Sequence, residues 1–297
     1  YDKNHTFTPP KKECRNHETT NHRYRLLLRR RSAMFGAIPK SAWSRRYPSD
    51  ETNGCVLAMR SLVIKTDDGR IVLVDNGAGN KHLKQQVNYR FFNLVDLGTE
   101  LRNRGIQPEE ITDVVLTHLH FDHCGYTTQK DESTGIYFSH SQMRTTGLAQ
   151  AMGEFPSSER LERDSYFIEN MQAVADANSL RLLDADTSIC PTIELRLYDG
   201  HTPGQIVPYI HTEDRTFVFA GDVIPLVAAI SGMDLAYDTY PITSYNEKLR
   251  MLAEAAEKRQ ALIYCHDAYI RCTTVKRVNS YYKKDKEIPL KKTFLFP

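Results

Sequence analysis

Along the first half of the chain, some stretches have the apolar runs typical of β-strands and one has apolar positions at the spacing of an α-helix. Residues 55–66 (CVLAMRSLVIKT) and 70–75 (RIVLVD) are apolar runs, and the polar turn between them predicts a β-hairpin. Residues 91–105 carry apolar side chains at helical spacing, which predicts a helix that closes on Gly105. Residues 111–116 (ITDVVL) are short and nearly all apolar, so they predict a buried strand.

The second half repeats this mixture of strands and helices after a long polar section. Residues 139–178 form that section, which is polar and helix-prone. Strand-like runs, an amphipathic helix and a last buried strand follow it, at residues 180–184, 192–199, 205–211, 216–222, 246–259 and 261–265. Strands therefore fall into two groups, each associated with helices. This pattern predicts an α/β fold in which two sheets pack together with helices outside.

The two ends of the chain depart from this pattern. We divide the chain into an N-terminal arm (1–32), one domain (33–275) and a basic C-terminal tail packed on that domain (276–297). Within the arm, residues 23–31 (RYRLLLRRR) place five arginines around three leucines. A nucleic-acid groove is one interpretation, but a strand with solvated arginines is favoured because no other basic cluster supports binding. We therefore expect no nucleic-acid partner.

Composition narrows the function classes only slightly. Of the 297 residues, 40% are hydrophobic and 26% are charged, and the net charge of +2 implies no polyanion partner. The longest apolar run, residues 223–230, contains a proline and is far shorter than a membrane span. We expect a soluble protein and favour the cytoplasm, although a start at Tyr1 is compatible with a removed signal peptide. The six scattered cysteines indicate reduced, buried thiols.

Candidate metal ligands gather directly after the predicted strand 111–116. Residues 116–125 read LTHLHFDHCG, with three histidines and one aspartate inside six positions. Because His118 and His120 are two apart, extended backbone points their side chains the same way. Asp122 and His123 are adjacent, so they diverge once the backbone turns. Imidazoles crowded in this way without a ligand would have no compensation, which favours a metal site.

Three later strand-like runs also end in a candidate ligand, namely His201, Asp222 and His266. Seven imidazole and carboxylate groups are too many for one tetrahedral zinc ion, which takes four, and they suit two ions. If three histidines hold one ion, and two histidines with an aspartate hold the other, one carboxylate remains to bridge them. These ligand types suit Zn²⁺, and Mn, Fe, Co or Ni also fit.

The run HLHFDHCG, followed by DGHTPG, AGD and CHD, resembles the signature of the metallo-β-lactamase superfamily. The resemblance covers roughly residues 33–275 and implies an αββα sandwich of two mixed β-sheets flanked by helices. It implies that one metal is bound by His118, His120 and His201, that the second is bound by Asp122, His123 and His266, and that Asp222 bridges them. The strand-end Asp75 matches a family aspartate that orients a ligand histidine, and we assign Thr117 to the same supporting role.

Within that superfamily the chain looks most like the branch of N-acyl homoserine lactone lactonases and methyl parathion hydrolase. The stretches AMFGAIPKSAW (33–43), RSLVIKT, LVDNGAGNK and GDVIP carry this likeness. Many of these lactonases have a tyrosine three residues after the bridging aspartate, where it binds the substrate carbonyl. Pro225 occupies that position here. True two-zinc β-lactamases lack the bridging aspartate, so Asp222 argues against antibiotic hydrolysis.

These features predict a dinuclear metal-dependent hydrolase that cleaves a lactone or ester with a metal-bridging hydroxide, with Asp122 and Asp222 as catalytic residues. N-acyl homoserine lactone cleavage, which is quorum quenching, is one candidate reaction. A phosphotriester or aryl ester hydrolase and a glyoxalase II-like thioesterase are alternatives. A non-catalytic metal-binding protein is disfavoured, because lost catalysis would relax the need for seven ligands.

The substrate pocket and the oligomeric state are less constrained by the sequence. The expected partner is a small-molecule ester or lactone, and the Phe- and Leu-rich N-terminal half is compatible with a homodimer. We expect the pocket to be lined by Phe35, Ile38, Trp43, Tyr126 and Pro225. Simple packing of residues 33–43 onto the core is an equal alternative.

Overall fold

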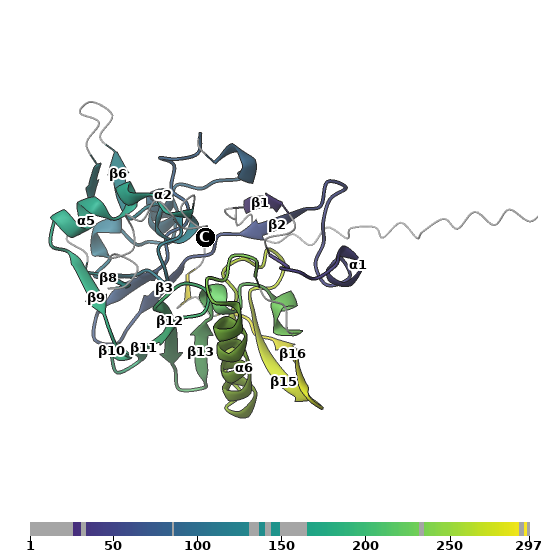
Figure 1. Cartoon of the computed structure of the whole chain (residues 1–297). Helices are drawn as coiled ribbons and strands as arrows, with labels where there is room; N and C mark the ends of the chain where they lie inside the picture. Colours follow the sequence, from purple (N-terminus) through teal and green to yellow (C-terminus); the bar gives the residue numbers. More distant parts are fainter. Residues whose placement is uncertain are drawn as a thin grey trace, which may run out of the picture.

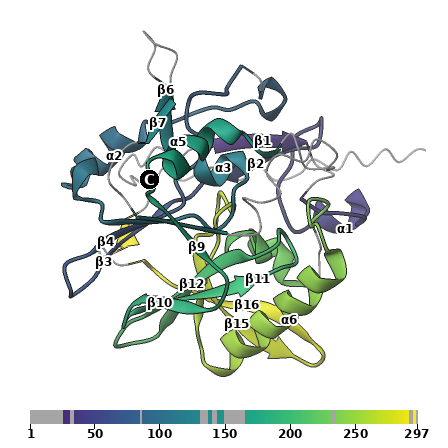
Figure 2. The ribbon, with the colours of Figure 1, turned by 60° about the vertical axis from the view of Figure 1, so that its left-hand side comes forward.

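The computed structural model describes residues 26–30, 34–84, 86–130, 137–139, 144–148, 165–231, 235–290 and 294–295. In this part of the chain two large β-sheets face each other, and helices cover their outer faces (Figures 1 and 2). The α/β class and the expected αββα sandwich of two mixed sheets are therefore confirmed.

The first sheet comes mainly from the N-terminal half and has six strands. In spatial order they are β17 (Phe294–Leu295), β3 (Leu62–Lys65), β4 (Ile71–Val74), β5 (Asp113–Val115), β8 (Arg144–Leu148) and β9 (Leu180–Leu183). Strands β3 and β4 pair antiparallel as the predicted hairpin, whereas β4, β5, β8 and β9 run parallel. The carboxyl ends of the parallel strands thus meet at one edge of the sheet.

The second sheet comes from the C-terminal half and has seven strands. In spatial order they are β10 (Thr187–Cys190), β11 (Ile193–Tyr198), β12 (Gln205–His211), β13 (Thr216–Phe219), β14 (Ala261–Ile263), β15 (Cys272–Val278) and β16 (Tyr281–Glu287). Only β13 and β14 are a parallel pair, and α6 connects them. Their carboxyl ends therefore also lie together at one edge.

Helices and small ribbons complete the described fold. The α-helices are α1 (Lys40–Trp43), α2 (Leu97–Asn103), α3 (Phe121–Cys124), α5 (Gln172–Asp176) and α6 (Pro241–Glu257). The 3-10 helices are η1 (Val87–Tyr89), η2 (Pro108–Glu110), η4 (Ile168–Asn170), η5 (Gly221–Val223) and η6 (Val227–Ser231). Strand β1 (Leu26–Arg30) pairs with β2 (Gly54–Ala58), and β6 (Thr128–Lys130) pairs with β7 (Tyr137–Ser139).

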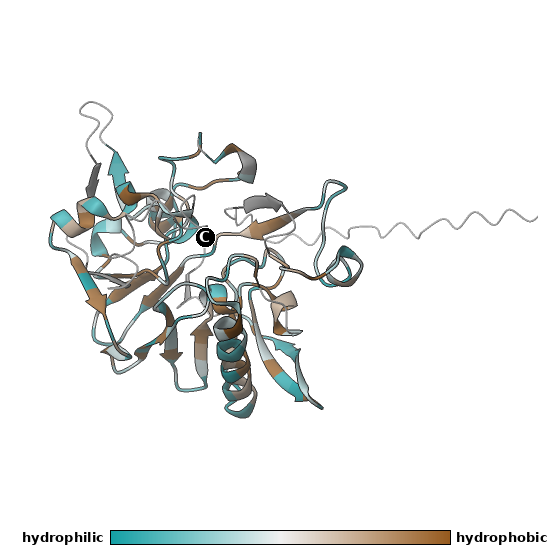
Figure 3. Cartoon of the chain, in the orientation of Figure 1, coloured by the Kyte–Doolittle hydropathy of each residue, from teal (hydrophilic) through white to brown (hydrophobic). Residues whose placement is uncertain are grey.

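The alternation of side chains along the strands explains how the second sheet is covered on both faces. Phe217 and Phe219 of β13 join the core between the sheets, whereas Val218 joins a second cluster on the outer face. Helix α6 packs on that outer face through Met251 and Leu252. Figure 3 shows brown on the middle strands of this sheet, whereas much of α6 and of the β15–β16 edge pair is teal, as expected for a strand layer covered by an amphipathic helix.

Two sequence predictions about elements are correct in kind but inaccurate in extent. The amphipathic helix predicted at 246–259 is present as α6, which begins earlier, at Pro241. The helix predicted at 91–105 is present as the shorter α2, which begins after the N-cap Asp96. The side chain of Asp96 accepts a hydrogen bond from the Thr99 N–H, so the cap fixes this start. Gly105 follows the helix with φ 73°, as predicted for its closing residue.

The prediction of one strand over residues 55–66 is wrong. The run divides into β2 and β3, and β2 pairs with β1 rather than with the first sheet. The break lies at Arg60, whose guanidinium is buried and donates to the backbone carbonyls of Tyr264 and Asp267. A buried guanidinium requires acceptors, so the chain leaves the strand to bring Arg60 to these carbonyls.

The expectation of a helix-prone section over 139–178 is only partly correct. Much of it lies outside the described residues, but β8 is a strand of the first sheet, while η4 and α5 are helical. At the C-terminal end, the residues assigned to a tail include β16, which is the edge strand of the second sheet. Residues 23–31, for which a strand was favoured, contain β1.

In the described residues the cysteines are reduced and buried, as the sequence predicts, and the helices are consistent with the short apolar runs. Cys55, Cys124, Cys190, Cys265 and Cys272 are free and buried, and Cys14 lies outside the described residues. Among the described helices, none combines the length and the apolar character needed to cross a bilayer.

Candidate metal centre

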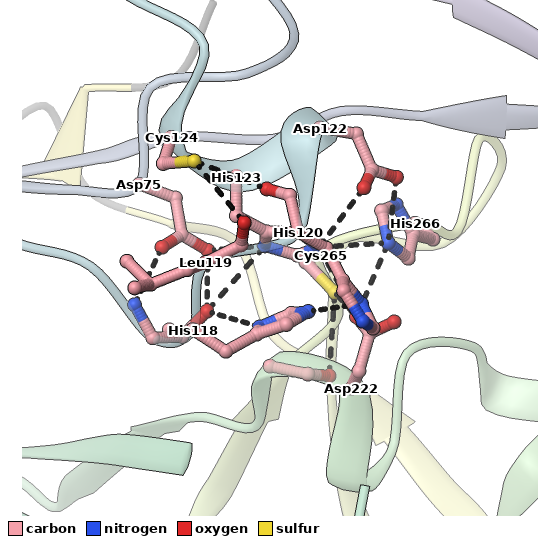
Figure 4. Close-up of polar contacts among 12 residues, drawn as sticks. Asp75, His118, Leu119, His120, Asp122, His123, Cys124, Asp222, Cys265 and His266 are labelled. Carbon is pink, nitrogen blue, oxygen red and sulfur yellow. Dashed lines mark hydrogen bonds and ion pairs between the residues drawn. The ribbon is translucent and has the colours of Figure 1, made fainter. Parts of the chain in front are cut away.

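The histidine-rich stretch forms a loop and one helical turn at the end of β5. The strand stops at Val115, His120 is still extended with φ −61° and ψ 146°, and α3 begins at Phe121. His118 and His120 therefore precede the turn, and Asp122 and His123 lie within it. Figure 4 shows these side chains meeting Asp222 and His266, which come from the other sheet.

The remaining candidates follow strands of the second sheet. His201 follows β11, Asp222 lies in η5 directly after β13, and His266 follows β14. All three side chains are buried and lie beside the residues of the first sheet. The structure thus brings together all seven residues that the sequence predicted as metal ligands.

Three histidines form the first group of potential ligands. His118 Nε2 lies 2.9 Å from His120 Nδ1, and His201 Nε2 lies 3.2 Å from the same nitrogen. Three ring nitrogens that converge at this spacing present their lone pairs to one point. An arrangement of this kind fits one divalent metal ion, for which neutral imidazole is a preferred ligand.

A second group combines two histidines with a carboxylate. His123 Nε2 and His266 Nε2 are 3.2 Å apart. The carboxylate of Asp122 lies 3.9 Å from His123 Nε2 through Oδ1 and 3.7 Å from His266 Nε2 through Oδ2. These three side chains also form a group able to hold a metal ion.

Asp222 lies between the two groups and faces each with a different oxygen. Its Oδ1 is 3.1 Å from His266 Nε2 and 3.4 Å from His123 Nε2. Its Oδ2 is 3.5 Å from His201 Nε2 in the other group. One carboxylate therefore reaches both potential metal positions.

Asp75 and Thr117 support the second group from behind. Asp75 Oδ1 accepts a hydrogen bond from the Thr117 N–H at 2.8 Å, and Asp75 Oδ2 accepts one from Thr117 Oγ1 at 2.9 Å. The same Oδ2 lies 2.7 Å from His123 Nδ1. A proton on Nδ1 leaves the lone pair of Nε2 free to point toward His266. Both residues predicted from the sequence to support the ligands thus contact a ligand histidine or its partner.

Several supporting contacts were not predicted from the sequence. Asp238 Oδ1 lies 2.9 Å from His201 Nδ1, and His266 Nδ1 donates to the Ala58 carbonyl at 2.8 Å. The Cys265 thiol donates to Asp222 Oδ1 at 3.2 Å. Because Asp238 follows no strand and the Ala58 acceptor is backbone, no residue pattern marks either contact. Cys265 carried a weak signal, since it directly precedes His266.

Burial and neighbouring charges hold His118 and Asp222 in the protonation states that can bind a metal ion. Burial lowers the pKa of His118 well below its usual value, and the neighbouring His123 and His120 lower it further. Burial would raise the pKa of Asp222, but His266, His123 and His201 outweigh it and hold that pKa well below the usual range. A neutral His118 and an ionised Asp222 are the protonation states that bind metal ions.

His123 differs from His118 because carboxylates surround it. Burial alone would lower its pKa, but the charges of Asp75, Asp222 and Asp122 raise it to about 9. Without a metal ion, a proton on His123 therefore balances the buried negative charge. A divalent ion would replace that proton and supply the same compensation.

The residues expected to line a substrate pocket have different surroundings. Phe35 and Trp43 are buried in a hydrophobic cluster, with their rings stacked at 4.6 Å, and Ile38 packs against the same cluster. This arrangement favours the packing alternative for residues 33–43. Pro225 is buried, and its carbonyl accepts a hydrogen bond from the His266 N–H at 3.1 Å. Tyr126 lines a cavity of about 170 Å³ beside α2.

An aromatic residue that the sequence analysis did not select lies closer to the ligands. The ring of Tyr166 is 5.0 Å from the ring of His120 in an edge-to-face contact. Tyr166 is partly buried and packs against the core between the sheets. It therefore forms part of the immediate surroundings of the first group of histidines.

Comparison with known proteins agrees with this fold. The family model described as the metallo-beta-lactamase superfamily matches residues 60–266, which contain all seven candidate ligands. An N-acyl homoserine lactonase of Bacillus thuringiensis is 21% identical over 169 residues, which are 55% of this chain and 58% of the relative. The aligned part of the chain thus spans less than two thirds of the length of this curated relative.

Solved structures resemble the chain over most of its length. A probable metal-dependent hydrolase from Staphylococcus aureus has a TM-score of 0.78 at 24% identity, covering 90% of this chain and 96% of that one. AidC, a dizinc quorum-quenching lactonase in complex with a product, has a TM-score of 0.71 at 15% identity, covering 90% of this chain and 93% of AidC. At these identities the likeness concerns the fold. Because the family model spans more than half of the sequence, the chain belongs to the metallo-β-lactamase superfamily of metal-dependent hydrolases.

Proposed function

We propose that this protein is a dinuclear metal-dependent hydrolase that cleaves a lactone or an ester. The observation that carries this proposal is the position of Asp222, whose Oδ1 faces His123 and His266 while its Oδ2 faces His201. A carboxylate with one oxygen toward each ligand group is suited to bridging two ions held a short distance apart.

The residues divide between the two ions by the groups to which they belong. A first ion would be held by His118, His120 and His201, and a second by Asp122, His123 and His266. Asp222, which faces both groups, would be their shared ligand. Zn²⁺ is our first candidate because imidazole and carboxylate are its usual nitrogen and oxygen ligands. Mn, Fe, Co and Ni accept the same ligand types. When bound, such ions lower the pKa of water to about 7 and polarise a carbonyl oxygen.

The side chains of the centre also control water and protons. The Cys265 thiol donates to Asp222 Oδ1 and so helps to orient this carboxylate between the two groups. We assign to the Asp122 carboxylate the proton that the attacking water loses as its oxygen bonds to the carbonyl carbon. Asp122 then delivers this proton to the leaving oxygen as the carbon–oxygen bond breaks. Burial of both aspartates keeps bulk water from competing for that proton.

The choice of a lactone or ester rests on similarity to lactonases and on the sequence of the centre. The lactonase relatives and the AidC structure support a lactone, and one solved relative contains N-hexanoyl-L-homoserine at its catalytic metal centre. Pro225 replaces the tyrosine found in many of these lactonases, so carbonyl binding must use another group. We propose that Tyr166, whose ring contacts the ring of His120, forms the wall of the substrate site beside the first group of histidines.

A panel of hydrolysis assays on the full chain tests this function. The substrates are an acyl homoserine lactone, a nitrophenyl ester, an aryl phosphotriester, S-lactoylglutathione and nitrocefin. We expect lactone or ester turnover that is lost after chelation and restored by Zn²⁺. Turnover of the phosphotriester alone, or of S-lactoylglutathione alone, would replace this proposal with the corresponding activity. Failure of the refilled protein on the whole panel would contradict it.

A substitution of Asp222 tests the role of this carboxylate directly. We expect Asp222→Asn to abolish turnover and to weaken binding of at least one ion, because the neutral amide loses charge and one of its two oxygens. The matched control is Asp67→Asn, since Asp67 is exposed in the hairpin turn at the other end of β4 from Asp75. Full activity of Asp222→Asn would refute the bridging role.

A further inference from the structure

A loop before α6 encloses the turn that carries His201. We call residues 235–240 the clasp. The Tyr240 N–H donates to the Gly200 carbonyl at 2.9 Å, and the Thr239 N–H donates to the His201 carbonyl at 2.9 Å. The Thr239 hydroxyl donates to the same His201 carbonyl at 2.9 Å. The clasp therefore holds the backbone on both sides of the His201 Cα.

The clasp also contacts the imidazole itself, through Asp238. Asp238 Oδ1 is 2.9 Å from His201 Nδ1, and both side chains are only 1% exposed. Its other oxygen accepts a hydrogen bond from the Leu235 N–H at 3.2 Å, within the clasp. On the far side of the ring, His201 Nε2 is 3.2 Å from His120 Nδ1. The ring is thus fixed from behind, with Nε2 directed at the first group of histidines.

We propose that Asp238 is the positioning residue for the first metal ion. By accepting a hydrogen bond from the Nδ1–H, it selects the tautomer of His201 whose Nε2 lone pair faces that ion. Its negative charge also makes Nε2 a stronger electron-pair donor to a metal. This proposal rests on the two-ion centre proposed above. It adds that the two ions are retained by separate buried carboxylates, and that removing Asp238 releases the first ion while leaving the second.

The histidines of the second group are oriented by residues other than Asp238, so we expect loss of the first ion to leave the second ion in place. His123 is oriented by Asp75, which is itself held by Thr117 at the end of the first sheet. His266 is oriented by the Ala58 carbonyl. Both supports precede the histidine loop in the chain, whereas the clasp belongs to the loop that leads into α6. A change at Asp238 therefore leaves these contacts of the second group in place.

Glu247 of α6 provides a matched control because it holds the same turn without touching the imidazole. Its Oε1 accepts from the Asp199 N–H and its Oε2 from the Gly200 N–H, both at 2.9 Å. Glu247 and Asp238 are both buried, so both changes are made at buried carboxylates. Glu247→Gln thus disturbs the backbone of the turn, whereas Asp238→Asn disturbs the ring of His201.

The experiment compares metal retention in the full-length wild type, Asp238→Asn, Asp238→Ala and Glu247→Gln. Each protein is filled with Zn²⁺ and dialysed against graded concentrations of EDTA, and the zinc-to-chain ratio is measured by mass spectrometry. For Asp238→Asn we expect one ion to be lost at an EDTA concentration about 10- to 100-fold lower than the wild type requires. Asp238→Ala should lose it at least as readily, and Glu247→Gln should retain both ions at a lower melting temperature.

A second readout identifies which ion is lost. In Co²⁺-filled protein, the visible spectrum of Asp238→Asn should lose the component of the site made by three histidines and keep the other. The proposal for Asp238 would be overturned if Asp238→Asn retained both ions up to the EDTA concentration that the wild type withstands. It would also be overturned if the variant lost both ions together. If the wild type itself takes up fewer than two ions, the two-ion function fails instead, so the two failures are distinguishable. Asp238→Asn keeps the size of the side chain and remains informative should the alanine variant not fold.

Discussion

At the scale of single residues, the centre depends on buried carboxylates that each hold one imidazole. Asp75 accepts two hydrogen bonds from Thr117 and one from His123, and it does so with φ 53°. This left-handed conformation is uncommon for residues other than glycine, although aspartate tolerates it better than most. The three hydrogen bonds offset that cost and fix the carboxylate against His123.

Replacing Asp75 with asparagine should weaken the second metal position. In Asp75→Asn the amide nitrogen has no acceptor role, so the variant loses either a Thr117 contact or the contact with His123. We expect metal affinity to fall by about 10- to 100-fold, as is typical when a carboxylate behind a ligand histidine is removed. Titration of the metal-free protein with Zn²⁺ measures this change, with Asp67→Asn as the control. Unchanged affinity would show that His123 needs no such support.

Only part of this residue-level picture was predictable. The seven ligand candidates were found because each lies at the end of an apolar run, whereas Asp75 was assigned from the resemblance to the superfamily. Asp238 was not, because its contact with His201 joins positions 37 apart and no local pattern marks it. For Phe35 a substrate pocket and simple packing were equal alternatives, because an apolar loop residue near a site gives the same pattern whether it faces a ligand or the core. The structure buries it in the core.

At the scale of elements, a close approach between two loops sets the position of α3. The Gly125 N–H donates to the Gly77 carbonyl, and a Cβ on Gly125 would lie 2.0 Å from Ala78 C and 2.1 Å from Ala78 O. The backbone of Gly125 is ordinary, with φ −66° and ψ −31°, so the constraint is space rather than conformation. The absence of a side chain thus lets α3, with Asp122 and His123, lie against the loop after β4.

Substitution of Gly125 by alanine should therefore displace α3. We expect Gly125→Ala to destabilise the fold by about 1–3 kcal/mol, as overpacking does, and to reduce metal affinity because Asp122 and His123 move. Thermal unfolding and Zn²⁺ titration measure the two effects. Gly98→Ala is the matched control, since Gly98 lies in α2 and the nearest atoms to its new Cβ are side-chain atoms at 3.4 Å or more. It should leave stability unchanged or raise it by about 0.4–1 kcal/mol. Equal stability of the two variants would refute the close-approach argument.

Element predictions succeeded where a local period dominates and failed where a distant contact intervenes. The hairpin of β3 and β4 and the amphipathic α6 follow from periods of two and 3.6 residues. The strand predicted at 55–66 failed because Arg60 binds carbonyls about 200 positions away, at Tyr264 and Asp267. Strand β8 was read as helix-prone because the polar composition around it carries no signal for its parallel neighbours β5 and β9.

At the scale of the whole molecule, the centre forms only when the two sheets are packed together. The first sheet contributes His118, His120, Asp122 and His123, and the second contributes His201, Asp222 and His266. In the unfolded chain the histidine loop at 118–123 is separated by many residues from His201, Asp222 and His266. The complete ligand set therefore exists only in the native state, so we expect metal ions to bind that state preferentially. The buried charges of the centre also require compensation, which bound ions would supply. Metal binding and folding are therefore linked.

This linkage predicts that metal ions stabilise the fold. At a free metal concentration of 100 times its Kd, one ion adds about 2.7 kcal/mol to the free energy of unfolding. We expect the melting temperature of the metal-free protein to rise with added Zn²⁺, and we expect Asp222→Asn to show a smaller rise. Calorimetry of the metal-free and refilled proteins measures both. A melting temperature that does not respond to Zn²⁺ would mean that the buried groups hold no ion in the folded protein.

The number of metal ions per chain tests the two-ion centre most directly. The measurement is the metal-to-chain ratio by mass spectrometry, made on the full-length protein after refilling with Zn²⁺ and removal of unbound ions. Seven ligands arranged as two groups around Asp222 predict a ratio of two. A ratio of one or below in folded, refilled protein would contradict the account.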